Sequence, residues 1–243
     1  MIETAQHSVH PIGGSLRVFR QFVWLEVGSV KMAFSRPAHP RVTPAVGRLA
    51  KEVESSSCCN PKELFMANET LTHRLARRDD LEALRVLMDL AISELQKSFL
   101  DENQIASSRA IMGLDTQLID DETYFVVESE GQLAGCGGWS RRATMYGGDQ
   151  TPGRSAALLD PTKDAARIRA MYTHPNHTRK GVGRLIISLC EEAAKAEGFT
   201  KMELVATLSG EPLYRACGFV PYENIVDDRG GAGVPLLRMK KSL

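Results

Sequence analysis

The sequence lacks the features that would tie it to a membrane, to nucleic acid or to an oxidising compartment. Its 243 residues carry 30 Lys+Arg and 30 Asp+Glu, so no excess of one sign is available to attract a polyanion. The five cysteines show neither a Cys-x-x-Cys pair nor zinc-ligand spacing, which favours a reducing, cytoplasmic location. The longest apolar stretch, residues 18–34, contains Arg20, Glu26 and Lys31 and is too polar to cross a bilayer. We therefore expect no metal, no nucleic-acid partner and no membrane partner.

The first 65 residues differ from the rest of the chain. They contain 8 Lys+Arg and 5 Asp+Glu, scattered prolines and no sustained period of 2 or 3.6 residues. We interpret residues 1–65 as a poorly ordered extension and residues 66–243 as one domain. Glu3 and Glu26 depart from the nearly acid-free pattern of a transit peptide. Targeting, disorder and a start codon assigned upstream of Met66 therefore all remain open for this segment.

From residue 66 onward, helix and strand signals alternate. Asp79 and Asp80 precede a helix whose apolar side chains recur at i, i+3, i+4 and i+7 up to Leu95. Further helices are expected over residues 101–112, 182–197 and 210–217. Strands are expected over residues 70–76, 123–128, 132–140, 166–173, 201–206, 219–225 and 235–240. This order predicts an α/β (α+β) fold, with a mixed central sheet of about six to seven strands flanked by about four helices.

The most informative segment is residues 171–184, MYTHPNHTRKGVGR, which reads as a strand, a glycine-rich turn and the start of a helix. Gly181 and Gly183 let backbone N–H groups approach a ligand, and the helix supplies further N–H donors and the positive end of its dipole. Arg179, Lys180 and Arg184 add positive charge around the turn. The segment predicts a phosphate-binding turn, although it has neither the Gly-Lys-Ser/Thr ending of a P-loop nor the third glycine of a dinucleotide fingerprint.

Three blocks, taken in order, resemble the GNAT superfamily of acetyl-CoA-dependent N-acyltransferases over residues 70–240. The first is the strand with His174 and Pro175 that leads into the turn at residues 178–183, and the second is the helix that follows. The third is the segment EPLYRACGF at residues 211–219. The resemblance implies the GNAT acyltransferase fold for residues 66–243 and acetyl-CoA as a co-substrate, without a metal.

The resemblance assigns coenzyme A contacts to two neighbouring segments. In the family, the strand before the turn pairs its backbone with the pantetheine arm, here through Met171, Tyr172 and Thr173. The turn holds the pyrophosphate, here through Thr178, Arg179, Lys180, Gly181, Val182, Gly183 and Arg184. Thr178 stands where relatives usually have Gln or Arg, and Ser209 stands where many have Asn before the short helix.

The resemblance also suggests which residues move protons. Tyr214 matches the family's tyrosine that hydrogen-bonds the coenzyme A sulfur and can protonate the departing thiolate. The alternative is a core tyrosine with a satisfied hydroxyl. Glu203 matches an acidic position that some relatives use as a base, and Glu128 could act near the acceptor through a water molecule. Either carboxylate could instead be a solvated strand residue that faces away from the cleft.

The acceptor is expected near the first two helices, the hairpin and the long loop that follows it. Trp139 with Arg141 or Arg142 is one hypothesis for binding an anionic or planar part of a small amine, and a core aromatic with solvated arginines is the alternative. A basic acceptor would call for an acidic cleft. One acidic cluster is available, formed by Asp115, Asp120, Asp121 and Glu122.

The resemblance therefore implies an N-acetyltransferase that transfers acetyl directly from acetyl-CoA to the primary amine of a small molecule or protein, as a monomer or homodimer. Two alternatives remain open. One is a coenzyme A-binding regulatory module without turnover. The other is an unrelated phosphate-binding α/β domain, such as a nucleotide-binding protein.

Overall fold

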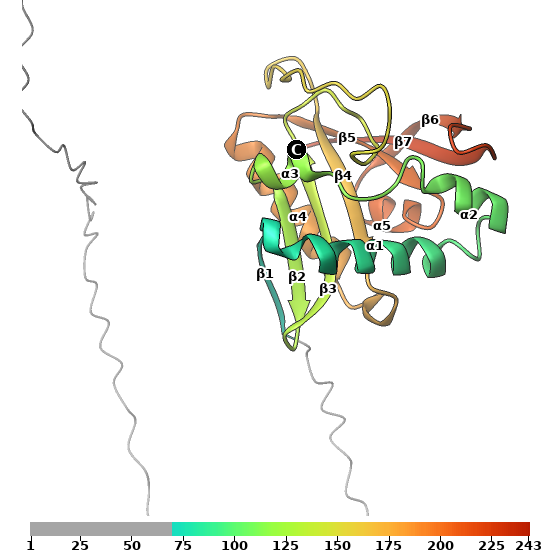
Figure 1. Ribbon diagram of the computed structural model, residues 1–243. Coiled ribbons are helices and arrows are strands. Elements are labelled where there is room, and N and C mark those ends of the chain that lie inside the picture. Colours follow the sequence, from blue (N-terminus) through green and yellow to red (C-terminus); the bar gives the residue numbers. More distant parts are fainter. Residues whose placement is uncertain (1–69) are drawn as a thin grey trace, which may run out of the picture. The chain divides into compact units, whose positions relative to one another are not determined.

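The computed structural model describes residues 70–243, and the predicted extension over residues 1–65 lies outside the described residues. Seven strands form one mixed sheet in the order β1-β2-β3-β4-β5-β7-β6 (Figure 1). All neighbouring pairs in this sheet are antiparallel except β4 with β5, which is parallel. The fold class predicted from the sequence is confirmed. The strands are β1 (Leu71–Leu75), β2 (Tyr124–Ser129), β3 (Gln132–Ser140), β4 (Ala166–Thr173), β5 (Lys201–Thr207), β6 (Val220–Asp227) and β7 (Val234–Ser242).

Helices cover both faces of the sheet. One face carries α1 (Leu81–Leu95), α2 (Glu102–Ser108) and α3 (Thr116–Asp120), and the other carries α4 (Val182–Ala196) and α5 (Glu211–Ala216). In Figure 1, α1 crosses in front of the sheet and α4 lies behind it. Two short 3₁₀ turns, η1 (Arg78–Asp80) and η2 (Pro175–His177), precede α1 and α4. In the described part of the chain, no helix combines the length and apolar character needed to span a bilayer.

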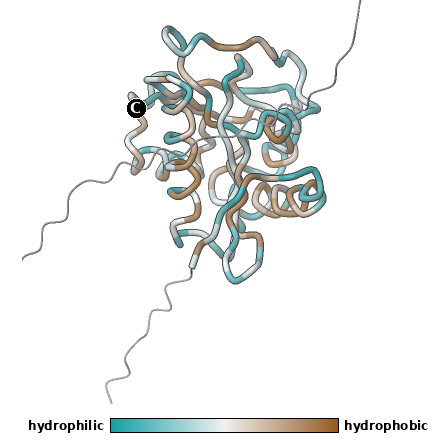
Figure 2. The backbone as a smooth tube through the Cα atoms, turned by 90° about the vertical axis from the view of Figure 1, so that its left-hand side faces the viewer, coloured by the Kyte–Doolittle hydropathy of each residue, from teal (hydrophilic) through white to brown (hydrophobic). Residues whose placement is uncertain are grey.

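The two longest helices bury the apolar stripes that their sequences predict. Helical segments in Figure 2 accordingly carry both brown and teal stretches. On α1 the buried residues are Leu84, Leu87, Met88, Ala91 and Ile92. On α4 they are Val182, Ile186, Ile187, Cys190 and Ala194. Because apolar side chains recur every three to four positions, each helix can place one stripe on the sheet.

The segment between α1 and β2 differs from the expected single helix over residues 101–112. Asp101 caps α2 by accepting the Gln104 amide at 2.8 Å, but the helix ends at Ser108. The Ser107 hydroxyl donates to the Ala232 carbonyl at 2.6 Å, which fixes the last turn to the β6–β7 loop. The next residues form tighter i→i+3 turns, and the short helix α3 follows, which the sequence analysis did not predict.

The sheet opens between β4 and β5. Within the described residues their register contains only the pairs Ala166↔Met202 and Arg167↔Glu203. A bulge in β4 lies beyond this point, because Ala170 has a φ of 48° and the register with β3 shifts between Cys136 and Gly138. A bulge increases the local bend of a strand. After Arg167, the edge of β4 that faces β5 therefore borders an opening, whereas its other edge remains paired with β3.

Candidate functional site

A cleft of about 510 Å³ lies where β4 and β5 part. Its walls come from α1, the end of β4, the N-terminal turn of α4, and α5 with the loop before it. Because the two strands diverge here, backbone groups of β4 and the start of a helix face the same space. The cleft therefore offers strand N–H and C=O groups together with helix N–H groups to one ligand.

The N-terminus of α4 has the geometry of an anion-binding turn. Gly181 has a φ of 91° at the N-cap position, and Arg179 before it has a φ of 64°. The first hydrogen bond of the helix runs from the Leu185 amide to the Gly181 carbonyl at 2.9 Å. The amides of residues 182–184 precede this bond and are the donors that a helix start leaves for a ligand. Arg184 adds a positive side chain to the lining of the cleft.

Gly183 serves a different purpose from Gly181. A Cβ on Gly183 would lie 2.6 Å from the Leu213 Cδ2 atom, so the absence of a side chain lets α4 pack against α5. A Cβ on Gly181 would instead have open space among the described residues, where the nearest atom outside the adjoining chain is the Leu71 Cδ1 atom at 3.9 Å. Its requirement is the positive φ, which residues with a Cβ rarely adopt.

The structure brings most of the predicted coenzyme A contacts together. The described residues that line the cleft do not include Lys180. Ser209 lies with its hydroxyl 3.0 Å from that of Thr207. The predicted contacts that do line the cleft are Met171, Tyr172, Thr173, Thr178, Arg179, Gly181, Val182, Gly183, Arg184 and Ser209.

A second, smaller cavity of about 90 Å³ lies beside the cleft. It is lined by the bulged part of β4, by β5 and β7, and by two loop segments, residues 111–113 and 145–147. The two spaces share five lining residues, which mark where they meet. These are Met112, Met171, Tyr172, Thr207 and Tyr214.

Tyr214 stands at this junction. It is 8% exposed and packs edge-on against Phe219, with 6.1 Å between the ring centroids. Burial, reinforced by the nearby Cys190 and Cys217, raises the pKa of Tyr214 well above its usual value. The phenol therefore keeps its proton at neutral pH and can donate it to a group in either space.

The two candidate carboxylates are engaged elsewhere. Glu203 is joined to Arg167 at 2.5 Å, at the end of the sheet where β4 and β5 are still paired. Glu128 on β2 is joined to Arg74 at 3.0 Å. Neither glutamate is among the described residues that line the two cavities.

Trp139 and Arg141 form part of the packing on the α4 side. Trp139 is 2% exposed and packs edge-on against Phe199 at 5.9 Å. The Arg141 guanidinium lies 5.5 Å from the Trp139 ring and 2.8 Å from Glu197. Both residues lie outside the set that lines the cavities. Trp139 therefore lies in the core and Arg141 lies at its edge, as in the alternative interpretation of this pair.

The acidic cluster does not create an acidic cleft. Three of its carboxylates are each joined to an arginine, in the pairs Asp115–Arg169, Asp120–Arg78 and Asp121–Arg142. Arg142 holds the pKa of Asp121 below its usual range through a charged hydrogen bond. The negative charges of these three aspartates are therefore compensated within the protein.

Sequence reasoning placed the long loop after the hairpin near the acceptor, but it did not single out Met112, Met145 or Arg169, which line the smaller cavity. Met112 and Met145 lie in loops, and a loop sequence does not show which strand it packs against. For Arg169 the sequence did contain one indication: alternation along β4 places Arg169 and Arg167 on the same face of the strand. Its burial, with 3% exposure, follows from the loops that cover it.

The family model described as the acetyltransferase (GNAT) family matches residues 84–219. The chain therefore belongs to the GNAT acetyltransferase family, whose members transfer acetyl groups. The matched segment contains α4, its glycine turn and Tyr214. A comparison with curated proteins gave no match.

Solved structures similar to this chain were also found. A GCN5-related N-acetyltransferase from Rhodopseudomonas palustris is 19% identical, with a TM-score of 0.54, covering 72% of this chain and 96% of that one. PaiA N-acetyltransferase from Thermoplasma acidophilum, in complex with coenzyme A, is 16% identical with a TM-score of 0.47, covering 72% and 99%. A GNAT family acetyltransferase from Brucella melitensis, in complex with acetyl-CoA, is 15% identical with a TM-score of 0.44, covering 72% and 89%. The first likeness supports the fold.

Proposed function

We propose that the protein is an acetyl-CoA-dependent N-acetyltransferase that acetylates the primary amine of a small molecule or peptide. The observation that carries the proposal is the position of Tyr214, where a cleft ending at a helix N-terminus meets a second, smaller cavity. The cleft takes the acetyl donor and the smaller cavity takes the acceptor amine. The two reactants then approach one another beside one phenol.

In this proposal the α4 turn binds the pyrophosphate of acetyl-CoA. The amides of residues 182–184 donate to its oxygens, and Arg179 and Arg184 add charge-assisted hydrogen bonds. The pantetheine arm lies along the part of β4 that follows Arg167, where the strand has left its pairing with β5. The thioester then reaches the bulge at Ala170, close to Tyr214.

The reaction needs one bond made and one broken. The lone pair of the neutral amine attacks the thioester carbonyl carbon and forms the C–N bond. The C–S bond then breaks, its electron pair leaves on sulfur, and Tyr214 donates its proton to the thiolate. The amine nitrogen gives up a proton, so the tyrosine is reprotonated and the products are an amide and coenzyme A. Burial keeps Tyr214 protonated before the reaction, so that its proton is present when the thiolate forms.

Glu203 enters the proposal as a base that acts through water. It shares one face of β5 with Val205 and Thr207, and both of these line the smaller cavity. Successive residues on one face of a strand are about 7 Å apart, which is too far for direct proton transfer from an amine beside Val205. A bridging water would bring Glu203 within reach. Both glutamates pair with an arginine, Glu203 with Arg167 and Glu128 with Arg74, and Glu203 is preferred because its strand lines the smaller cavity.

A panel of amines tests the proposal, with release of free coenzyme A measured by a thiol reagent. The wild-type protein is expected to release thiol only when a suitable amine is present. Tyr214→Phe is expected to bind acetyl-CoA normally and to release thiol about 100-fold or more slowly, as for loss of a general acid. Acetyl-CoA binding without thiol release across the whole panel would instead indicate a regulatory module. Thiol release by Tyr214→Phe at the wild-type rate would remove the acid role and leave the fold assignment intact.

A further inference from the structure

Arg169 holds a loop that forms one wall of the smaller cavity. It lies on β4 immediately before the bulged residue Ala170, and its side chain is 2% exposed. One of its terminal nitrogens donates to the Thr144 carbonyl at 2.9 Å, and the other donates to the Gly147 carbonyl at 2.6 Å. Met145 and Tyr146 lie between these two carbonyls and line the cavity. One guanidinium therefore fixes both ends of the cavity-lining segment.

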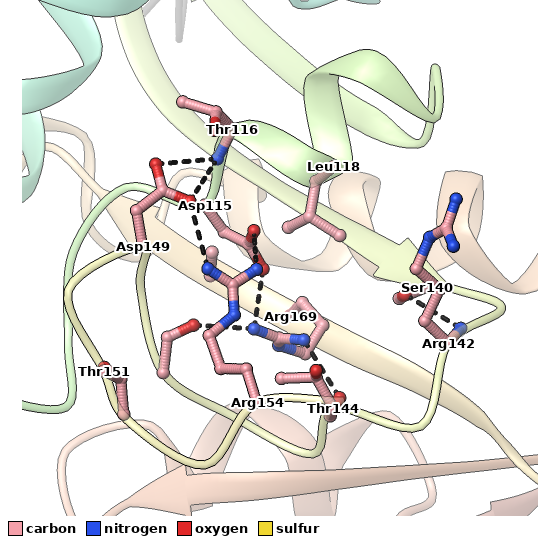
Figure 3. Close-up of polar contacts among 12 residues, drawn as sticks. Asp115, Thr116, Leu118, Ser140, Arg142, Thr144, Asp149, Thr151, Arg154 and Arg169 are labelled. Atoms are coloured by element: carbon pink, nitrogen blue, oxygen red, sulfur yellow. Dashed lines mark hydrogen bonds and ion pairs between the residues drawn. The ribbon is translucent and has the colours of Figure 1, made fainter. Parts of the chain in front are cut away.

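The charge of Arg169 is compensated by Asp115, which is also buried. One Asp115 oxygen accepts from Arg169 at 2.7 Å, and the other accepts from Arg154. Arg154 is joined in turn to Asp149 at 3.0 Å, and Asp149 accepts the Thr116 amide at 3.1 Å. Figure 3 shows the two arginines converging on Asp115, with Asp149 and Thr116 beside them. The network ties the start of α3 and the 144–154 loop to β4.

We propose that Arg169 is a positioning residue for the acetyl acceptor: it holds the Met145–Tyr146 wall beside the β4 bulge, so that the amine meets the thioester in the attacking orientation. The proposal rests on the proposed function, because it takes the smaller cavity as the acceptor site. Asp115 and the two carbonyls engage the terminal nitrogens of the guanidinium. Arg169 therefore acts on the acceptor through the loop.

The geometry explains why arginine is needed at this position. A guanidinium is planar and presents several donors in a fixed fork, so that it can bind two carbonyls and a carboxylate at once. A lysine at the same position would present its three donors from one nitrogen, without the fixed spread of the guanidinium fork, and would hold the two ends of the segment less firmly. Arg169→Lys therefore keeps the charge that Asp115 requires but loosens the wall. Arg169→Met removes both the charge and the hydrogen bonds.

The first test separates acceptor binding from cofactor binding. For Arg169→Lys, we expect the acceptor KM to rise at least about tenfold, as for the loss of a charge-assisted hydrogen bond, and the acetyl-CoA Kd to stay within about twofold of the wild-type value. Arg78→Met is the matched control, because Arg78 also pairs with an aspartate, Asp120, and no contact joins it to residues 144–147 in the described part of the chain. It should leave the acceptor KM unchanged.

The second test does not depend on turnover. Amide hydrogen exchange should become faster at residues 143–148 in Arg169→Lys and stay unchanged at the α4 turn. If Arg169→Met does not fold, Asp115→Asn combined with Arg169→Gln removes both charges together and should show the same local exchange. Unchanged exchange at residues 143–148 would contradict the proposal whatever the acceptor is.

Two kinetic outcomes would also overturn the proposal. An unchanged acceptor KM in folded Arg169→Lys would show that the Met145–Tyr146 wall keeps its position without the Arg169 hydrogen bonds. A loss confined to amines that carry a carboxylate, with neutral amines unaffected, would show that Arg169 binds the substrate directly. Failure of the wild-type protein to turn over any amine would refute the proposed function. The exchange experiment would still decide whether Arg169 holds residues 143–148 in place.

Discussion

The substitution Gly181→Ala adds one methyl group and tests whether the turn before α4 binds the cofactor. Its φ of 91° is a left-handed conformation, which costs a residue with a Cβ about 1–2 kcal/mol. A Cβ at this position would have open space, because the nearest atom is the Leu71 Cδ1 atom at 3.9 Å. The effect of Gly181→Ala therefore comes from the backbone and not from a clash. The turn can relieve the strain only by rotating the amides that face the cleft.

We expect Gly181→Ala to lower the free energy of unfolding by about 1–2 kcal/mol and to weaken acetyl-CoA binding by about tenfold or more, as one misaligned charge-assisted hydrogen bond would. Denaturant unfolding measures the first quantity and calorimetric titration measures the second. Gly231→Ala is the matched control, because Gly231 has a φ of 104° and open space but lies outside the cleft. It should lose similar stability and bind acetyl-CoA normally. The reasoning fails if both variants lose the same stability and both bind with wild-type affinity.

Three further predictions follow from other residues. Because burial raises the pKa of Tyr214 above its usual value, coenzyme A release should rise with pH as the amine loses its proton and should show no decline near pH 10 from phenol ionisation, in a stopped-flow pH profile. Trp139→Ala should lower the free energy of unfolding by about 3–5 kcal/mol and leave the acceptor KM of the folded fraction unchanged, since the ring is in the core. Glu203→Gln should lower kcat at neutral pH and recover it at high pH, where the amine needs no base; a pH-independent defect would remove its role as a base.

The helices and strands that leave a pattern in consecutive residues could be predicted from the sequence. The α4 stripe, the positive-φ glycine at its start and the strands of the sheet each leave a pattern in consecutive residues, and the structure contains all of them. The second helix was predicted to run to residue 112 but ends at Ser108. Its end depends on the hydrogen bond from Ser107 to Ala232, which is 125 residues away in the sequence. Contacts of that kind have no signature in a short window.

The site divides in the same way. The glycine turn and Tyr214 belong to continuous motifs, so their shared cleft could be anticipated. The wall of the smaller cavity depends on where the 144–154 loop packs. Arg169 is buried where two carbonyls of this loop and the Asp115 carboxylate, which precedes α3, meet it. Trp139 shows the converse. At a strand end beside two arginines it was a candidate for acceptor binding, yet it packs against Phe199 and lines neither described cavity.

The most direct test of the central claim is a calorimetric titration of the wild-type protein with acetyl-CoA, with NAD titrated in parallel. The account predicts saturable binding of one acetyl-CoA per chain, no heat from NAD, and weaker acetyl-CoA binding in Gly181→Ala. An absence of acetyl-CoA binding, or equal binding of NAD, would contradict the assignment of the β4–α4 cleft to an acetyl donor.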